Sequence, residues 1–205
     1  MTKKKKNKID FRYLLIEALL IVFTVSLAMA LNEWRANVKE EKTVEKVRTN
    51  ILNEIKANRA DLIEKMAYHQ ETSQRIARYL ANDSLWATLK YKNGIEVTMQ
   101  LMPRGIFEPN LQSGAWDGAV LSGLVNSFEY EFLEEFSTLY HMQADGPNSS
   151  WKVMAGFFSE SSSYEPENAK TLMLRFQLSF AVLHSQEQNL LNMYNHGLKN
   201  WDAAE

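Results

Sequence analysis

Residues 13–35, YLLIEALLIVFTVSLAMALNEWR, decide the architecture of this 205-residue chain. The apolar run extends from Tyr13 to Leu31 and is interrupted by one charge, at Glu17. In a helix, a run of this length spans roughly 28 Å, close to the thickness of the hydrocarbon core of a bilayer. Tyr13 and Trp34 lie at its ends, where aromatic rings favour the membrane interface. The stretch predicts one transmembrane helix over residues 13–31, with Tyr13 and Trp34 as interface anchors.

The distribution of basic residues predicts the orientation of this helix. Residues 32–51 carry five Lys or Arg, whereas the first twelve residues carry six: Lys3, Lys4, Lys5, Lys6, Lys8 and Arg12. The dense N-terminal block and the long C-terminal part favour a cytoplasmic tail over residues 1–12. We therefore expect a single-pass protein of the bacterial inner membrane, with its C-terminal domain in the periplasm.

A cleaved signal peptide is the alternative interpretation of the same segment. Residues 28–30, Ala-Met-Ala, resemble a cleavage site, and residues 18–30 have the length of a signal-peptide apolar region. The chain has no cysteine, which excludes a lipoprotein anchor on the chain as given. Both interpretations place most of the chain outside the cytoplasm.

Glu17 lies on a helix face that also carries Ile21, Thr24 and Ala28. A carboxylate inside a membrane helix is costly, by about 2.5–3.5 kcal/mol at the helix centre on insertion scales of charged residues. This face therefore predicts either a contact with another membrane helix or a Glu17 side chain that reaches the cytoplasmic headgroups.

Beyond the membrane segment the sequence predicts one long helix. The composition is low in Gly (8) and Pro (4), and neither residue occurs before Gly94. From Glu33 to Leu80 the apolar positions recur at helical spacing: Val44, Val47, Ile51, Ile55, Leu62, Met66, Ile76 and Leu80. Polar residues at 58, 69 and 73 make this stripe poor for an isolated coiled coil. We expect residues 32–81 to form a stalk whose later half packs against downstream helices.

Residues 82–205 are expected to complete an all-α fold, an antiparallel helical bundle. Residues 95–101 alternate apolar and polar side chains, so a strand and a helix distorted ahead of Pro103 both remain open. Asn126 and Glu129 have the spacing of a capping box. The last long helix follows Pro166 and repeats apolar residues at Ala169, Leu172, Phe176, Phe180, Leu183, Leu190, Tyr194 and Leu198.

Two clusters of residues resemble a widespread family of uncharacterised bacterial membrane proteins. They are residues 16–35, with an I-E-x-x-L-I-V pattern followed by N-E-W, and residues 113–124, with a Ser-x-x-Trp pattern before Ser-Gly-Leu. The resemblance implies a single membrane span and an extracytoplasmic helical domain, and it implies no activity. It also implies that Glu17 is part of the family pattern.

Catalytic and cofactor motifs are missing from the sequence. The four histidines are scattered without metal-ligand spacing, and there is no nucleophile elbow or phosphate-binding loop. The acidic residues at 131, 134 and 135 recur at helical spacing opposite a phenylalanine face, which indicates a solvated surface. The net charge of −2 gives no reason to expect nucleic acid. We expect no enzyme, no metal and no cofactor; Trp116 and Trp151 are the candidates for a ligand groove.

Two functions remain. One is a membrane-anchored structural or accessory subunit that projects its bundle outward to contact a larger membrane complex or its own copies. The other is an extracytoplasmic ligand-binding or sensor module that signals through a partner. Because the predicted cytoplasmic side has only about 12 residues, too few for an output domain of ordinary size, the first function is favoured.

Overall fold

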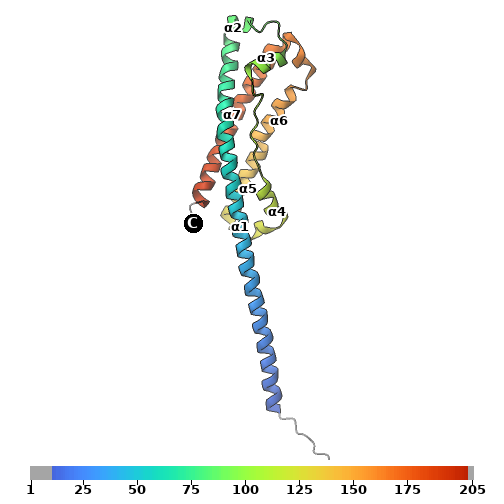
Figure 1. Cartoon of the computed structure of the whole chain (residues 1–205), viewed down its shortest axis with the longest axis vertical. Coiled ribbons are helices and arrows are strands. Elements are labelled where there is room, and N and C mark those ends of the chain that lie inside the picture. The colour runs from blue at the N-terminus through green and yellow to red at the C-terminus, as the bar shows by residue number, and fades with distance from the viewer. Residues whose placement is uncertain (1–10, 203–205) are drawn as a thin grey trace, which may run out of the picture. The chain divides into compact units, whose positions relative to one another are not determined.

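The computed structural model describes residues 11–202, and within that range it assigns no strand. Its α-helices are α1 (Phe11–Ala81), α2 (Asp83–Ala87), α3 (Gly94–Leu101), α4 (Gly114–Leu121), α5 (Tyr130–Asp145), α6 (Pro147–Phe157) and α7 (Ala169–Trp201) (Figure 1). Three 3-10 helices join them: η1 (Leu124–Ser127), η2 (Ser161–Tyr164) and η3 (Pro166–Asn168). The predicted all-α fold is confirmed.

α1 is one helix of 71 residues that takes part in both compact units of the chain, Met1–Lys46 and Val47–Glu205. It contains no proline or glycine, so no helix-breaking residue interrupts it. Its N-terminal part is long and apolar enough to cross a membrane, with a mean hydropathy of 2.5. A signal sequence near the N-terminus has the same properties. Of the predicted cytoplasmic tail, residues 1–10 lie outside the described residues.

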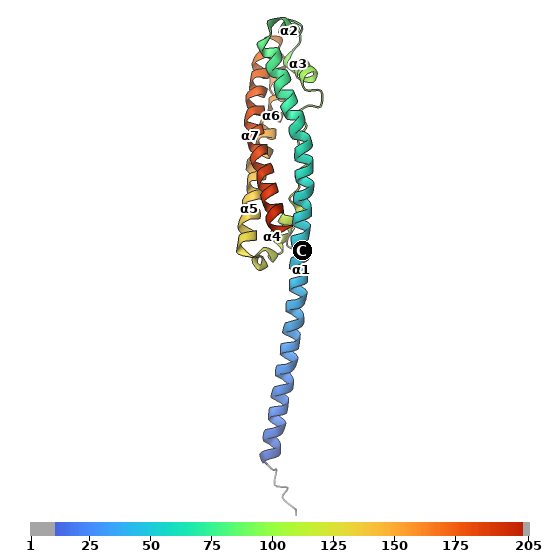
Figure 2. The same ribbon diagram turned by 90° about the vertical axis from the view of Figure 1, so that its left-hand side faces the viewer.

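In the second unit, α1 from residue 47 onward packs antiparallel to α7, as predicted for the stalk's later half (Figures 1 and 2). Lys56 Nζ lies 2.6 Å from Asp202 Oδ1, and His69 Nδ1 lies 2.8 Å from Glu187 Oε1. Residue numbers thus rise along one helix while they fall along the other.

α5 and α6 together form a third long segment beside α7 (Figures 1 and 2). Gly146 and Pro147 separate the two helices, and Pro147 occupies the first turn of α6, where its missing N–H costs nothing. A Cβ at Gly146 would lie 2.6 Å from the Met142 carbonyl oxygen, so the break requires glycine. The bundle therefore consists of three long helical segments, to which α2, α3 and α4 are added.

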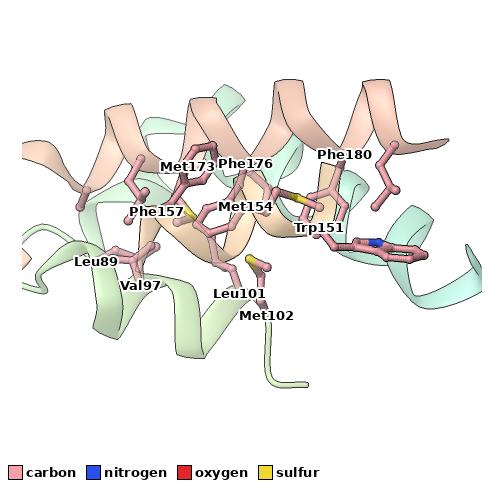
Figure 3. Close-up of a cluster of buried hydrophobic side chains, with 14 residues drawn as sticks. Leu89, Val97, Leu101, Met102, Trp151, Met154, Phe157, Met173, Phe176 and Phe180 are labelled. Atoms are coloured by element: carbon pink, nitrogen blue, oxygen red, sulfur yellow. The ribbon is translucent and has the colours of Figure 1, made fainter. Parts of the chain in front are cut away.

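Two apolar clusters form the core of this unit. The first joins α3, α6 and α7 with the end of α1, and Figure 3 shows Met154, Phe176 and Phe180 among its side chains. The second joins α1, α4, α5 and α7, with Ile55, Phe136 and Leu190 fully buried. The apolar residues predicted on α1 and α7 belong to these clusters or pack against them, with the exception of Val44.

Two local predictions are settled by helix capping. Residues 95–101 belong to helix α3, whose start is fixed by a capping box between Asn93 and Glu96. The capping box predicted at Asn126 and Glu129 is wrong: Asn126 lies inside η1, and α5 begins at Tyr130 without a side-chain cap. Gly123, with φ 74°, turns the chain into η1 and so displaces the helix start.

Candidate functional site

The predicted membrane face lies on α1 within the first unit. Glu17, Ile21, Thr24 and Ala28 are all exposed there, and Ile21 has 59% of its surface accessible. The Thr24 hydroxyl donates a hydrogen bond to the Leu20 carbonyl oxygen at 2.7 Å, so its polar group is satisfied within the helix. If this face contacts another membrane helix, Glu17 is the polar group that would need a partner on that helix.

The predicted interface anchors are placed only in part. Trp34 follows the apolar run and is 63% exposed. Tyr13 belongs to α1, but its side chain lies outside the described residues. An exposed tryptophan at the end of an apolar helix suits the headgroup layer of a membrane.

Trp116 and Trp151 do not meet in a groove. Trp116 is 8% exposed and stacks on Tyr140 in the second apolar cluster, with ring centroids 5.3 Å apart. Trp151 is 1% exposed and belongs to the first cluster (Figure 3). Both indoles are core residues of the bundle.

The segment between α3 and α4, residues 102–113, is neither helix nor strand and lies along α1, and we call it the strap. Side chains of α1 satisfy main-chain groups along the strap and at the end of α3. Asn58 bonds both the N–H and the carbonyl of Gln112, at 2.8 and 2.7 Å. The remaining pairs are Asp61 with the N–H of Asn110, Tyr68 with Gly105 and Arg104, His69 with Ile106, and Arg75 with Leu101. The strap thus has hydrogen-bond partners without forming a sheet.

Asn58 also belongs to a polar network inside the bundle. Its amide lies 3.3 Å from Gln143 Oε1, which accepts a 2.8 Å hydrogen bond from the Tyr194 hydroxyl. Burial raises the pKa of Tyr194, so the hydroxyl stays protonated at neutral pH. α1, α5 and α7 are thereby joined by side chains whose hydrogen bonds are satisfied, an arrangement that specifies one packing.

His69 and Glu187 form a buried pair of ionisable groups, with 1% and 0% of their surface exposed. His69 Nδ1 lies 2.8 Å from Glu187 Oε1, and Nε2 lies 2.8 Å from the Ile106 carbonyl oxygen. A carbonyl only accepts, so Nε2 carries a proton. The other proton lies on either Nδ1 or Glu187, which gives an ion pair or a neutral pair. Glu187 Oε2 has no hydrogen-bond partner in the protein.

A groove of about 590 Å³ runs between α5 and α7 and is rimmed by Glu131, Glu134 and Glu135. Glu135 accepts a 2.7 Å hydrogen bond from Trp201 Nε1 and lies 2.7 Å from His196 Nδ1. Burial raises the pKa of Glu135, but these hydrogen bonds outweigh it, so the pKa lies below its usual value. The predicted solvated acidic face is thus also the rim of a groove.

The described part of the chain contains no group of three His, Asp or Glu side chains arranged to hold a metal ion. Sequence reasoning missed the buried His69–Glu187 pair because 118 positions separate its members. The available signals were two polar residues inside apolar stripes: His69 on α1, and Glu187 between Leu183 and Leu190 on α7. The described bundle contains internal polar contacts that join its helices, and the N-terminal part of α1 exposes an apolar surface.

Comparison with protein-family models, with curated proteins and with solved structures finds no match for this chain.

Proposed function

We propose that this chain is a membrane-anchored accessory subunit, whose bundle lies outside the cytoplasm and contacts a larger membrane complex or further copies of the chain. One observation carries the proposal: the N-terminal part of α1 exposes a continuous apolar surface. The large apolar side chains there are each 47–68% accessible: Leu14, Leu15, Ile16, Leu19, Leu20, Ile21, Val22, Phe23, Val25, Leu27, Met29 and Leu31.

The size of that surface favours a membrane over water. Burying a large apolar side chain completely is worth about 1.5–3 kcal/mol, so covering twelve that are about half exposed is worth on the order of 10 kcal/mol. Soluble monomers rarely expose an apolar patch of this extent. The resemblance of residues 16–35 to single-span bacterial membrane proteins supports the same proposal, with the bundle in the periplasm.

An accessory role is favoured by what the bundle buries. Its histidine–carboxylate pair and its amide network are internal, and their hydrogen bonds join helices to one another. Such contacts stabilise a scaffold and offer no reacting atom to a substrate. The exposed face that we propose as the contact with a partner lies on α1 and includes Glu17.

Mild-detergent extraction of the full-length chain from its native membrane, followed by mass spectrometry of the co-eluting proteins, tests the proposal. We expect a stoichiometric complex, resistance to carbonate extraction, and an intact mass that includes residues 1–30. A mass that begins after Ala30 would show a cleaved signal peptide instead. A carbonate-resistant monomer without partners would contradict the accessory role while leaving the anchor in place.

A pair of variants tests the membrane face within this proposal. Glu17→Leu should weaken co-purification of the partner and leave the bundle folded, because it removes a carboxylate that needs a partner in the membrane. Ser26→Leu is the matched control, since Ser26 lies about 180° around the helix from Glu17. Equal recovery of partners with both variants would remove Glu17 from the contact.

A further inference from the structure

The charged residues of α1 between the apolar run and the bundle are segregated by sign. Arg35, Lys39, Lys42 and Lys46 fall within about 60° of arc at 100° per residue. All four are exposed, and with Trp34 and its neighbours they line one open hollow on the helix. We call these four residues the basic stripe.

The acidic residues of the same segment lie outside the basic arc and spread over about 140°, with Glu45 about 90° from the centre of the basic stripe. Glu33, Glu40, Glu41 and Glu45 are exposed, and their directions centre about 160° from the centre of the basic stripe. We call them the acidic stripe. The two stripes contribute equal and opposite charge, so the segment is neutral overall but strongly polar across its width.

This neutrality argues against a layer of anionic lipid headgroups as the partner. Attraction of the basic stripe to such a layer is offset by repulsion of the acidic stripe at the same height above the membrane. A surface with both signs on opposite sides is instead suited to a neighbour that presents the opposite sign at matching heights.

A second copy of the chain meets that requirement. Copies anchored in one bilayer point the same way and stand at the same height, and this step rests on the membrane anchoring proposed above. Lys39 and Lys42 lie within about 3 Å, along the helix axis, of the level of Glu40 and Glu41. Lys46 likewise lies about 1.5 Å from the level of Glu45. Side by side, the basic stripe of one copy therefore faces the acidic stripe of the next in register.

We propose that copies of this chain associate laterally through residues 33–46, with the basic stripe of one copy against the acidic stripe of its neighbour. A two-fold contact centred on either stripe would place like charges together, which is repulsive. With the basic stripe of one copy against the acidic stripe of the next, the interface is heterologous, and each copy presents a basic side to one neighbour and an acidic side to another. Association should weaken as salt rises, because exposed pairs are screened.

Disulfide trapping in native membranes tests this arrangement, since the chain has no cysteine of its own. A full-length chain with both Lys42→Cys and Glu41→Cys should form a ladder of cross-linked oligomers on oxidation. Either single substitution should leave monomers, because like positions face away from each other in a heterologous contact. Cross-linking of a single-cysteine chain as efficient as that of the double-cysteine chain would overturn the proposal.

Reversal of the charges in the stripes provides a second test of the lateral association. In the double-cysteine chain, Lys39→Glu with Lys46→Glu should lower the cross-linked yield by about tenfold, the loss expected from two ion pairs replaced by repulsion. Adding Glu40→Lys and Glu45→Lys, which exchanges the stripes, should restore it. Lys90→Glu with Lys152→Glu, at exposed positions of the bundle, is the matched control and should have no effect.

The outcomes distinguish failure of the lateral association from failure of the membrane anchoring on which it rests. A carbonate-resistant chain that shows no ladder, or whose ladder survives the reversal of Lys39 and Lys46, overturns the lateral association alone. A chain that carbonate releases overturns the anchor and, with it, the shared height of the stripes.

Discussion

Replacing Glu187 with leucine should destabilise the bundle by about 3–5 kcal/mol, the usual cost of breaking a buried pair from one side. Glu187 is fully buried against His69 at 2.8 Å, so the substitution leaves Nδ1 without a partner in the core. A loss of this size is a large part of a total stability of about 5–15 kcal/mol.

The double variant His69→Leu/Glu187→Leu is the informative comparison. It removes both polar groups together and leaves only the Ile106 carbonyl oxygen without its donor, which costs about 1–3 kcal/mol. The stability losses of His69→Leu and Glu187→Leu, added together, should therefore exceed the loss of the double variant by at least about 3 kcal/mol. Glu187→Gln should cost less than about 1.5 kcal/mol, because its amide can donate to Nδ1 while Nε2 still bonds the strap.

Urea unfolding of the full-length chain in detergent measures these differences. The fluorescence of Trp116 and Trp151 reports loss of the core, since both indoles are buried. Unfolding of Glu187→Leu at the same urea concentration as the parent chain would contradict the prediction. A double variant that loses as much stability as the two single variants added together would contradict it as well.

Three further predictions concern the bundle. Gly94→Ala should destabilise the bundle by about 1–3 kcal/mol in thermal unfolding, because its Cβ would lie 2.6 Å from a main-chain carbonyl oxygen. Gly118→Ala is the control: its Cβ would meet nothing within 4 Å, so the substitution should be neutral or stabilising. Asn93→Ala should cost about 1 kcal/mol through loss of its capping box, and Asn126→Ala, which removes no cap, should be silent in the same assay. Glu135 has a lowered pKa in the folded state, so its contribution to stability is complete above the unfolded pKa of about 4.3 and is lost as pH falls through the folded value. Glu135→Gln should therefore lower the unfolding temperature at pH 7 and flatten its decline below pH 5; an equally steep acid decline in this variant would contradict the assignment.

The sequence was most informative where a long periodic pattern decided the outcome. On α1, apolar residues such as Ile51, Ile55, Leu62 and Ile76 recur at helical spacing, and the structure buries all four. Periodicity over many turns outweighs local exceptions, so the helical bundle could be predicted. The short alternation of residues 95–101 could not be resolved in the same way, because a few residues fit a strand and a helix equally well.

The internal polar contacts could not be predicted because their partners are distant in the chain. Asn58 interrupts an apolar stripe, and only the fold shows that Gln112 and Gln143 lie against it. The strap depends on such contacts throughout, so its path has no local sequence signal. The predicted membrane face around Glu17 stays a prediction, because a contact with another membrane helix would involve a second molecule.

The strap also has a consequence for how this sequence can diverge. Its main-chain groups are bound by side chains of α1, including Asn58, Tyr68 and His69, whereas its own side chains make few of these bonds. Main-chain groups are the same for every residue except proline, so many strap sequences can satisfy the same α1 surface. Descendants of this protein should therefore vary most at exposed strap positions such as Glu108. Substitutions should be rarer at Asn58 and His69, and at Arg104, whose side chain bonds Glu64.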